Sequence, residues 1–202
     1  EAAICGGRNV LVVEVDPRYD GWWYEGGGIY RHVRLVTVDP VHIAPDGVFV
    51  APKLEDPRGA ETSDAVIHAD TEVTNTSSAP VSAIVSSEVI DAEDRVVAVA
   101  SSTYEIGISA SLKVSQQIPL PHAILWSPAH PYLYRLRSTV KVADRTTDRA
   151  ITTFGVRHVR FDAGEGFFLN GRPFKLQGVN MHQDRAGVGV AMPDRLFTWR
   201  LE

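Results

Sequence analysis

The chain has 202 residues, of which 44% are hydrophobic and 22% charged, a composition typical of globular proteins with one large or two modest domains. Its formal net charge of −5 disfavours nucleic acid or an anionic membrane as the main partner. The single cysteine, Cys5, excludes an internal disulfide framework, and no apolar run approaches membrane-spanning length.

The first forty residues predict two β-strands joined by an aromatic loop. Residues 9–15 and 29–38 are rich in Val, Leu and Ile, which favour strands. The loop between them carries Trp22, Trp23 and Tyr24, whose rings suit either stacking on a sugar or packing in a local core. Because two strands do not form a stable sheet alone, we expect both to belong to a larger domain.

The middle of the chain alternates apolar and polar residues with a period of two. Such alternation is typical of strands with one buried and one solvent-exposed face. Six or seven such strands with no helical stretch predict an antiparallel β-sandwich of the immunoglobulin type. The clearest strands are residues 41–50, 65–74, 81–89, 95–100, 110–118 and 136–142.

A hairpin is predicted next. In Asn170-Gly171 both residues accept positive φ, which makes the pair a strong hairpin signal. Residues on either side supply apolar strand positions, namely Phe161, Phe167, Phe168 and Leu169.

Residues 174–179 predict a buried strand that ends in three polar side chains, Asn180, His182 and Asp184. Polar groups at the carboxyl end of a strand are typical of barrel active sites. Solvated residues at the edge of a β-domain would give the same composition.

The sequence offers no motif for a metal or a nucleotide. The seven histidines are scattered and form no HExxH pattern, so neither a metal nor another cofactor is expected within this chain. No GxSxG nucleophile motif is present, and Gly187-Val188-Gly189 lacks the third glycine of a dinucleotide loop.

Four stretches resemble glycoside hydrolase family 2. The pattern FG-x-R-x-x-x-FD at residues 154–162, followed by GFFLNG-x-P-x-K-L-x-GVN-x-H-x-D at 166–184, is similar to the start of that family's catalytic barrel. Residues 178–195, GVNMHQDRAGVGVAMPDR, resemble the bacterial β-galactosidases of the family. Residues 22–35 resemble the segment that closes its jelly-roll domain, and residues 125–134 resemble its W-x-P-x-x-P-x-LY segment, in which Trp126 would pack at a corner of the sandwich.

The resemblance implies a mostly β fold: an immunoglobulin-like β-sandwich flanked by the last strands of a jelly roll and the first strand of a (β/α)8 barrel. Residues 1–39 would be the C-terminal part of the jelly-roll sugar-binding domain, residues 40–158 the sandwich, and residues 159–202 the start of the TIM-barrel catalytic domain. The first helix of the barrel would begin near residue 194, N-capped by Asp194.

By the same resemblance, the chain is expected to be a fragment of a retaining hydrolase of terminal β-galactosides. Its two catalytic carboxylic acids would follow Glu202 in later barrel strands, so no catalytic residue is expected here and the chain alone should be inactive. A β-glucuronidase or β-mannosidase of the family, or a non-catalytic binding or assembly module, stays open as an alternative.

The resemblance also places His182 in the substrate pocket, where it would donate a hydrogen bond to a sugar hydroxyl. Asn180 and Asp184 would belong to the same substrate-binding site by orienting the strand end and its loop. A half-buried histidine bonded to backbone is the alternative for His182. Assembly into a homo-oligomer stays open, as does a cytoplasmic, periplasmic or secreted location in a bacterium.

Overall fold

The structure, a computed structural model, describes residues 6–16, 18, 29, 32–54 and 57–202. The chain divides into two compact units, Val36–Gln177 and a smaller unit made of Glu1–Leu35 with Gly178–Glu202. The expected aromatic loop with Trp22, Trp23 and Tyr24 lies outside the described residues.

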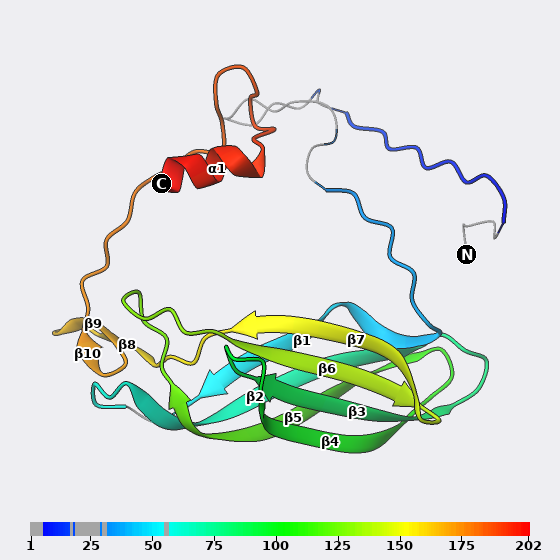
Figure 1. Cartoon of the computed structure of the whole chain (residues 1–202). Coiled ribbons are helices and arrows are strands. Elements are labelled where there is room, and N and C mark those ends of the chain that lie inside the picture. Colours follow the sequence, from blue (N-terminus) through cyan, green and yellow to red (C-terminus); the bar gives the residue numbers. More distant parts are fainter. Residues whose placement is uncertain (1–5, 17, 19–28, 30–31, 55–56) are drawn as a thin grey trace. The chain divides into compact units, whose positions relative to one another are not determined.

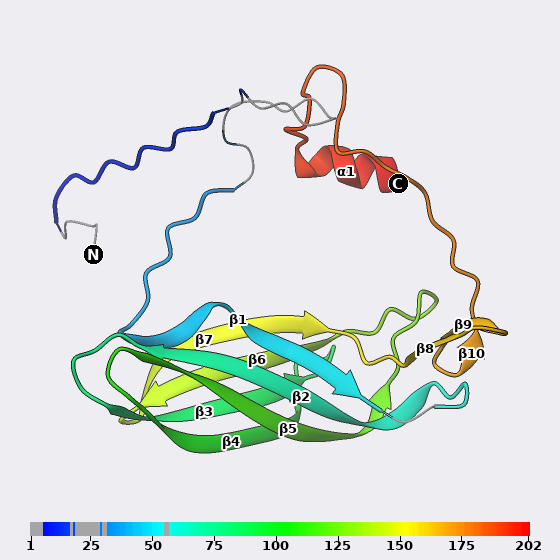
Figure 2. The ribbon, with the colours of Figure 1, turned by 180° about the vertical axis from the view of Figure 1, so that it is seen from behind.

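The larger unit contains a β-sandwich of two antiparallel sheets (Figures 1 and 2). One sheet has the order β1-β2-β5 and the other the order β4-β3-β6-β7. Strands β4 and β5 lie side by side along one margin and β1 and β7 along the other, so the sheets meet at both sides. The strands are β1 (Val41–Lys53), β2 (Thr62–Asn75), β3 (Val81–Ile90), β4 (Val96–Ile106), β5 (Ala110–Ile124), β6 (Tyr134–Val142) and β7 (Arg145–Phe154). The predicted mostly β sandwich is confirmed.

The alternation of buried and outward-facing residues along the strands explains why the two sheets pack face to face. In β2, every second residue from Ala65 to Asn75 is buried, and its neighbours face outward. The buried residues form two apolar groups between the sheets. The first core cluster comprises Ala65, Ile67, Ala69, Val89, Ile118, Leu120, Ala123, Leu125, Tyr134, Leu136, Phe154 and Val156. The second core cluster comprises Val41, Ile43, Val73, Ala83, Val85, Ile106, Val114 and Val140.

Polar side chains fix the end of the sandwich at which the chain enters. The Asp39 carboxylate accepts two hydrogen bonds from the Arg145 guanidinium, at 2.7 and 2.8 Å, which tie the start of β1 to the β6–β7 turn. Hydrogen bonding to Arg145 also lowers the pKa of Asp39. Nearby, the fully buried Asn75 donates through Nδ2 to the carbonyls of Ala79 and Gly107, at 2.8 and 3.0 Å.

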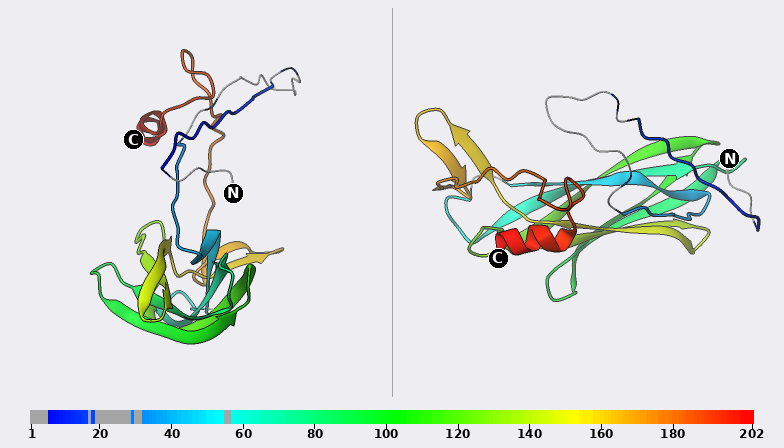
Figure 3. Two further views of the ribbon diagram at one scale, coloured as in Figure 1. Left: turned by 90° about the vertical axis from the view of Figure 1, so that its right-hand side faces the viewer. Right: turned by 90° about the horizontal axis from the view of Figure 1, so that it is seen from above.

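A second, small sheet follows the sandwich. Strands β8 (Val159–Asp162), β9 (Gly166–Leu169) and β10 (Arg172–Pro173) pair antiparallel in the order β10-β9-β8. Asn170 and Gly171 have φ of 52° and 75°, so the predicted hairpin and its turn are confirmed. Figure 3 shows this sheet at one end of the sandwich, where Gly59 donates to the Asn170 carbonyl at 2.9 Å.

Several strand predictions differ from the structure. Where residues 9–15, 29–38 and 174–179 are described, they form no strand. A strand requires a continuous hydrogen-bonded neighbour, and none of the described strands forms a ladder with these segments; the Phe174 amide alone donates to the Phe167 carbonyl, at 2.9 Å. Their apolar side chains are therefore exposed, with Leu35 at 97% and Val179 at 91%.

The smaller unit contains the helix α1 (Asp194–Leu201). The predicted N-cap at Asp194 is wrong: Pro193 is the N-cap residue, Asp194 is the first helical residue, and no side chain caps the helix. An acidic residue in the first helical turn still stabilises a helix through its dipole. Within the described residues, no helix is long and apolar enough to cross a membrane.

Candidate functional site

The three residues predicted for the sugar site lie in the smaller unit, between Gly178 and α1. Asn180 and His182 are exposed and Asp184 is partly buried. They follow a segment that forms no strand, so a position at the end of a buried strand is not observed. Their assignment to a sugar site stays a prediction.

Arg200 of α1 holds this segment. Its guanidinium donates to the backbone carbonyl of His182 at 2.9 Å and to that of Asp184 at 2.6 Å. Because a guanidinium is planar, two bonds from one group fix the spacing of both carbonyls. A single helical side chain therefore sets the backbone on either side of Gln183, and the histidine ring and the aspartate carboxylate do not take part in these bonds.

A tight turn follows, and it brings the segment back to the helix. Gly187 and Gly189 have φ of 89° and 57°, a region that glycine occupies without strain. Arg185 and Gly189 form an isolated antiparallel bridge, and the Arg185 guanidinium stacks over the Trp199 ring at 4.6 Å. The cation–π contact and the Arg200 bonds thus attach the segment to α1 through two consecutive helical residues.

The described residues contain no group of three or more His, Cys, Asp and Glu side chains that could hold a metal ion. The expectation that the chain needs no metal or other cofactor stays a prediction.

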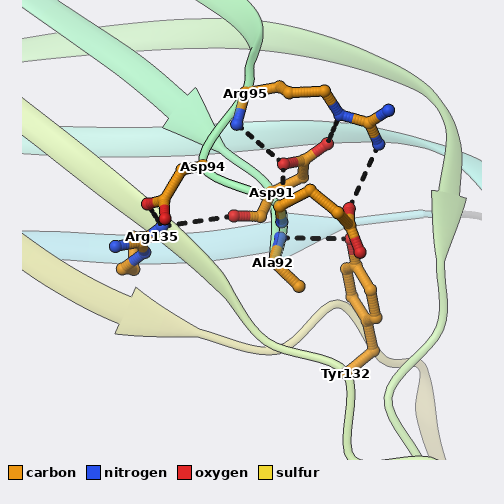
Figure 4. Close-up of polar contacts among 7 residues, drawn as sticks. Asp91, Ala92, Asp94, Arg95, Tyr132 and Arg135 are labelled. Carbon is orange, nitrogen blue, oxygen red and sulfur yellow. Dashed lines mark hydrogen bonds and ion pairs between the residues drawn. The ribbon is translucent and has the colours of Figure 1, made fainter.

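A second polar cluster, which sequence reasoning missed, lies at the β3–β4 turn (Figure 4). Asp91 is 3% exposed, and its carboxylate accepts backbone bonds from Glu93 and Arg95 at 3.0 and 2.9 Å. It also accepts a bond from the Arg95 guanidinium at 2.7 Å. Burial opposes ionisation of Asp91, yet these bonds outweigh burial and lower its pKa.

The same turn is attached to β6 and to the loop before it. Arg135 of β6 donates to the Asp91 carbonyl at 3.3 Å and forms an ion pair with Asp94. Tyr132 accepts a bond from the Ala92 amide at 3.2 Å. The sequence around Asp91 does not indicate this cluster, because Tyr132 and Arg135 lie about forty residues further along the chain. These bonds satisfy the buried charge internally, which indicates a structural cluster.

Loop 125–130 and the β9–β10 hairpin enclose a groove of about 340 Å³ in the larger unit. Leu125, Pro128 and Phe174 supply apolar walls, while Glu61 and Arg172 supply charges. Trp126 lies beside it as a half-buried corner of the sandwich: its carbonyl accepts a bond from Asn170 at 3.0 Å, and Arg157 stacks on its ring at 4.9 Å.

Comparison with known proteins identifies the family. The model described as glycosyl hydrolases family 2 matches residues 41–157, which is more than half of the chain. The chain belongs to glycosyl hydrolases family 2. The resemblance seen in the sequence is therefore confirmed.

Curated family 2 relatives align over nearly the whole chain. A β-galactosidase of Bacteroides ovatus is 35% identical over 96% of this chain and 22% of its own length. A putative β-glucuronidase of Formosa agariphila is 32% identical over 97% of this chain and 18% of its length. A β-galactosidase of Thermoanaerobacter pseudethanolicus is 35% identical over 94% of this chain and 25% of its length. The chain thus spans a quarter or less of these relatives.

Solved structures agree with the fold. A family 2 member from Bacteroides cellulosilyticus superposes with a TM-score of 0.79 and 28% identity, covering 89% of this chain and 22% of the other. A β-glycosidase from Bacteroides vulgatus gives a TM-score of 0.72 and 28% identity, covering 90% of this chain and 22% of the other.

Proposed function

We propose that the chain is part of a retaining glycoside hydrolase that removes terminal β-galactosyl groups, and that its sandwich supports the catalytic barrel. Family membership over residues 41–157 is the observation that carries this proposal. The galactoside is favoured because residues 178–195 resemble bacterial β-galactosidases and two β-galactosidases are 35% identical to this chain.

In this proposal residues 1–39 complete a jelly roll and residues 159–202 begin a TIM barrel. The exposed apolar side chains of Leu35 and Val179 support it, because each would be covered by further strands of those domains. The acid/base and nucleophile carboxylates would be supplied by later barrel strands, about 5 Å apart. This chain would then contribute sugar-binding residues and support the catalytic barrel, and by itself it would not hydrolyse a β-galactoside.

A β-glucuronidase is the second candidate, favoured by the relative of that description that is 32% identical over 97% of the chain. The two candidates share the family's carboxylate chemistry and differ in the sugar they accept. Residues that select the sugar would lie mostly outside residues 1–202.

The decisive experiment is to sequence the gene that encodes the chain past Glu202, express the full product and assay aryl β-D-galactoside, β-D-glucuronide and β-D-mannoside. We expect the highest kcat/KM for the galactoside and no turnover by the 202-residue chain alone. A preference for the glucuronide would replace the first candidate by the second. A gene product with no pair of barrel carboxylates and no turnover would identify a non-catalytic module.

His182 would contact the sugar in the full enzyme. We expect His182→Ala to lower kcat/KM by roughly 100-fold or more, the scale for losing one donor to developing charge. The matched control is His68→Ala, which removes a histidine from the outer face of β2 and should change kcat/KM by less than about twofold. Equal kinetics for both variants would assign His182 to backbone support alone.

A further inference from the structure

The interior of the sandwich contains a layer of polar side chains. Thr71, Ser87 and Ser138 have no exposed surface, and Gln116 is 6% exposed. Each comes from a different strand, β2, β3, β6 and β5 respectively, so both sheets contribute two residues. These four residues are named the polar layer.

The polar layer separates the two core clusters. On each strand, the buried residue two positions to one side of the polar residue belongs to the first core cluster, and that on the other side belongs to the second. The flanking pairs are Ala69 and Val73 on β2, Val89 and Val85 on β3, Ile118 and Val114 on β5, and Leu136 and Val140 on β6.

Strand register brings the four side chains together. Ser87 lies directly opposite Ser138 in the β3–β6 pair. Gln116 lies opposite Ala69 in the β2–β5 pair and is therefore diagonal to Thr71 on the same face. Gln116 also spans the two sheets, because its Nε2 donates to the Val85 carbonyl of β3 at 3.2 Å.

One oxygen of each side chain is buried without a hydrogen-bond partner among the described residues: Thr71 Oγ1, Ser87 Oγ, Gln116 Oε1 and Ser138 Oγ. A buried polar atom that loses water and gains no bond destabilises the fold. The three hydroxyls can donate or accept, whereas the amide oxygen can only accept. Together they match a ligand with two donors and two acceptor sites.

We propose that the polar layer is a binding site for one buried water molecule at the centre of the sandwich. The water donates to Gln116 Oε1 and to one hydroxyl, and it accepts from the other two hydroxyls. Buried waters in proteins make roughly two to four such bonds, so one water with four bonds can satisfy all four oxygens.

The site also fixes strand register. Sliding any of the four strands by two residues would move its polar side chain into a core cluster and remove one bond to the water. Four independent strands thus meet at one hydrogen-bonded point, which disfavours slipped pairings that apolar contacts alone would tolerate.

The test is a crystal structure of the 202-residue chain at about 1.6 Å resolution, combined with ¹⁷O magnetic relaxation dispersion in solution. We expect one water peak within about 2.6–3.2 Å of at least three of the four oxygens. A water of long residence should be detected in the wild-type chain and lost in Thr71→Val, whose side chain keeps the shape and removes the hydroxyl. A dry layer in which Ser87 and Ser138 bond to each other would overturn the proposal.

Melting temperatures of a matched pair of variants give an independent readout. Ser87→Ala removes a hydroxyl from the layer, while Ser86→Ala removes one from the outer face of the same strand, where it bonds Ser101. A bound water predicts that Ser87→Ala lowers the melting temperature by about 2–8 °C and Ser86→Ala by less than about 2 °C. An increase for Ser87→Ala would mean that the hydroxyl is unpaired in the native state, and no water site exists.

Discussion

Asp91 shows how one buried charge can be stabilised by its own turn. The carboxylate accepts two backbone bonds and one guanidinium bond, so its ionised form is preferred even though only 3% of the residue is exposed. Neutralising Asp91 removes its ion pair with the Arg95 guanidinium. The backbone amides of Glu93 and Arg95 would then donate to a neutral oxygen, which is a weaker acceptor than a carboxylate.

The pH dependence follows from the lowered pKa of Asp91. A carboxylate whose pKa is lower in the folded state stabilises the fold above its unfolded pKa of about 3.9, and this stability is lost as pH falls through the folded value. We expect Asp91→Asn to lower the melting temperature at pH 7. The further fall in melting temperature as the pH is lowered should be smaller in this variant than in the wild type. Thermal melts between pH 2.5 and 7 measure both effects.

Asp46→Asn is the control, because Asp46 is exposed at the irregularity of β1 between Ile43 and Val48, and its φ of 54° is acceptable to asparagine. Its melting curve should follow that of the wild type. If Asp91→Asn does the same at every pH, the bonds around Asp91 do not stabilise the fold.

At the scale of elements, Asn170 attaches the small sheet to the sandwich. Its side chain accepts a bond from the His158 amide at 2.9 Å and donates to the Trp126 carbonyl at 3.0 Å. The residue is only 7% exposed and has positive φ. One side chain therefore serves both the turn and the junction.

We expect Asn170→Gly to destabilise the chain by about 1–3 kcal/mol, since it keeps the positive φ and removes both side-chain bonds. Asn170→Ala should cost more, because it adds backbone strain. Urea unfolding measures both variants. If Asn170→Gly equals the wild type while Asn170→Ala is destabilised, only the turn conformation matters.

Strands and turns could be predicted from the sequence where the pattern of neighbouring residues agrees with their burial in the folded chain. The clean alternation of β2 and β5 and the Asn170-Gly171 turn were each sufficient to place their elements. The strand β7 was not placed, because its sequence RTTDRAITTF alternates weakly and most of it stays partly or fully exposed at a sheet edge. For the candidate site, the sequence predicted His182, Asn180 and Asp184. It could not indicate that Arg200 binds the carbonyls of His182 and Asp184, since that contact depends on how the helix packs.

At the scale of the whole molecule, the sandwich strands and the segments that precede and follow the β-sheets differ in backbone pairing. In the larger unit β2, β3 and β6 have strand neighbours on both sides. Residues 10–15, 33–38 and 175–179 have no assigned strand and expose large apolar side chains. Stability against local opening should therefore be distributed unevenly along the chain.

Hydrogen exchange followed by mass spectrometry should show this difference. We expect amides of β2, β3 and β6 to be protected by factors of about 10³ or more, and those of residues 10–15, 33–38 and 175–179 to exchange at close to intrinsic rates. In the full-length enzyme the same segments should become protected. Strong protection of them in the 202-residue chain would show that they pair without the rest of the parent.

The burial of Asn75 has a consequence for producing this protein. Asn75-Thr76-Ser77 has the form of an N-glycosylation sequon, and a glycan would be attached at Nδ2. In the folded sandwich that nitrogen is buried and bonded to the carbonyls of Ala79 and Gly107. Oligosaccharyltransferase could modify it only before the strands assemble, and a modified chain could not then bury the residue. In a eukaryotic secretory host, glycan transfer and folding would compete for the same side chain, whereas bacterial cytoplasm imposes no such competition.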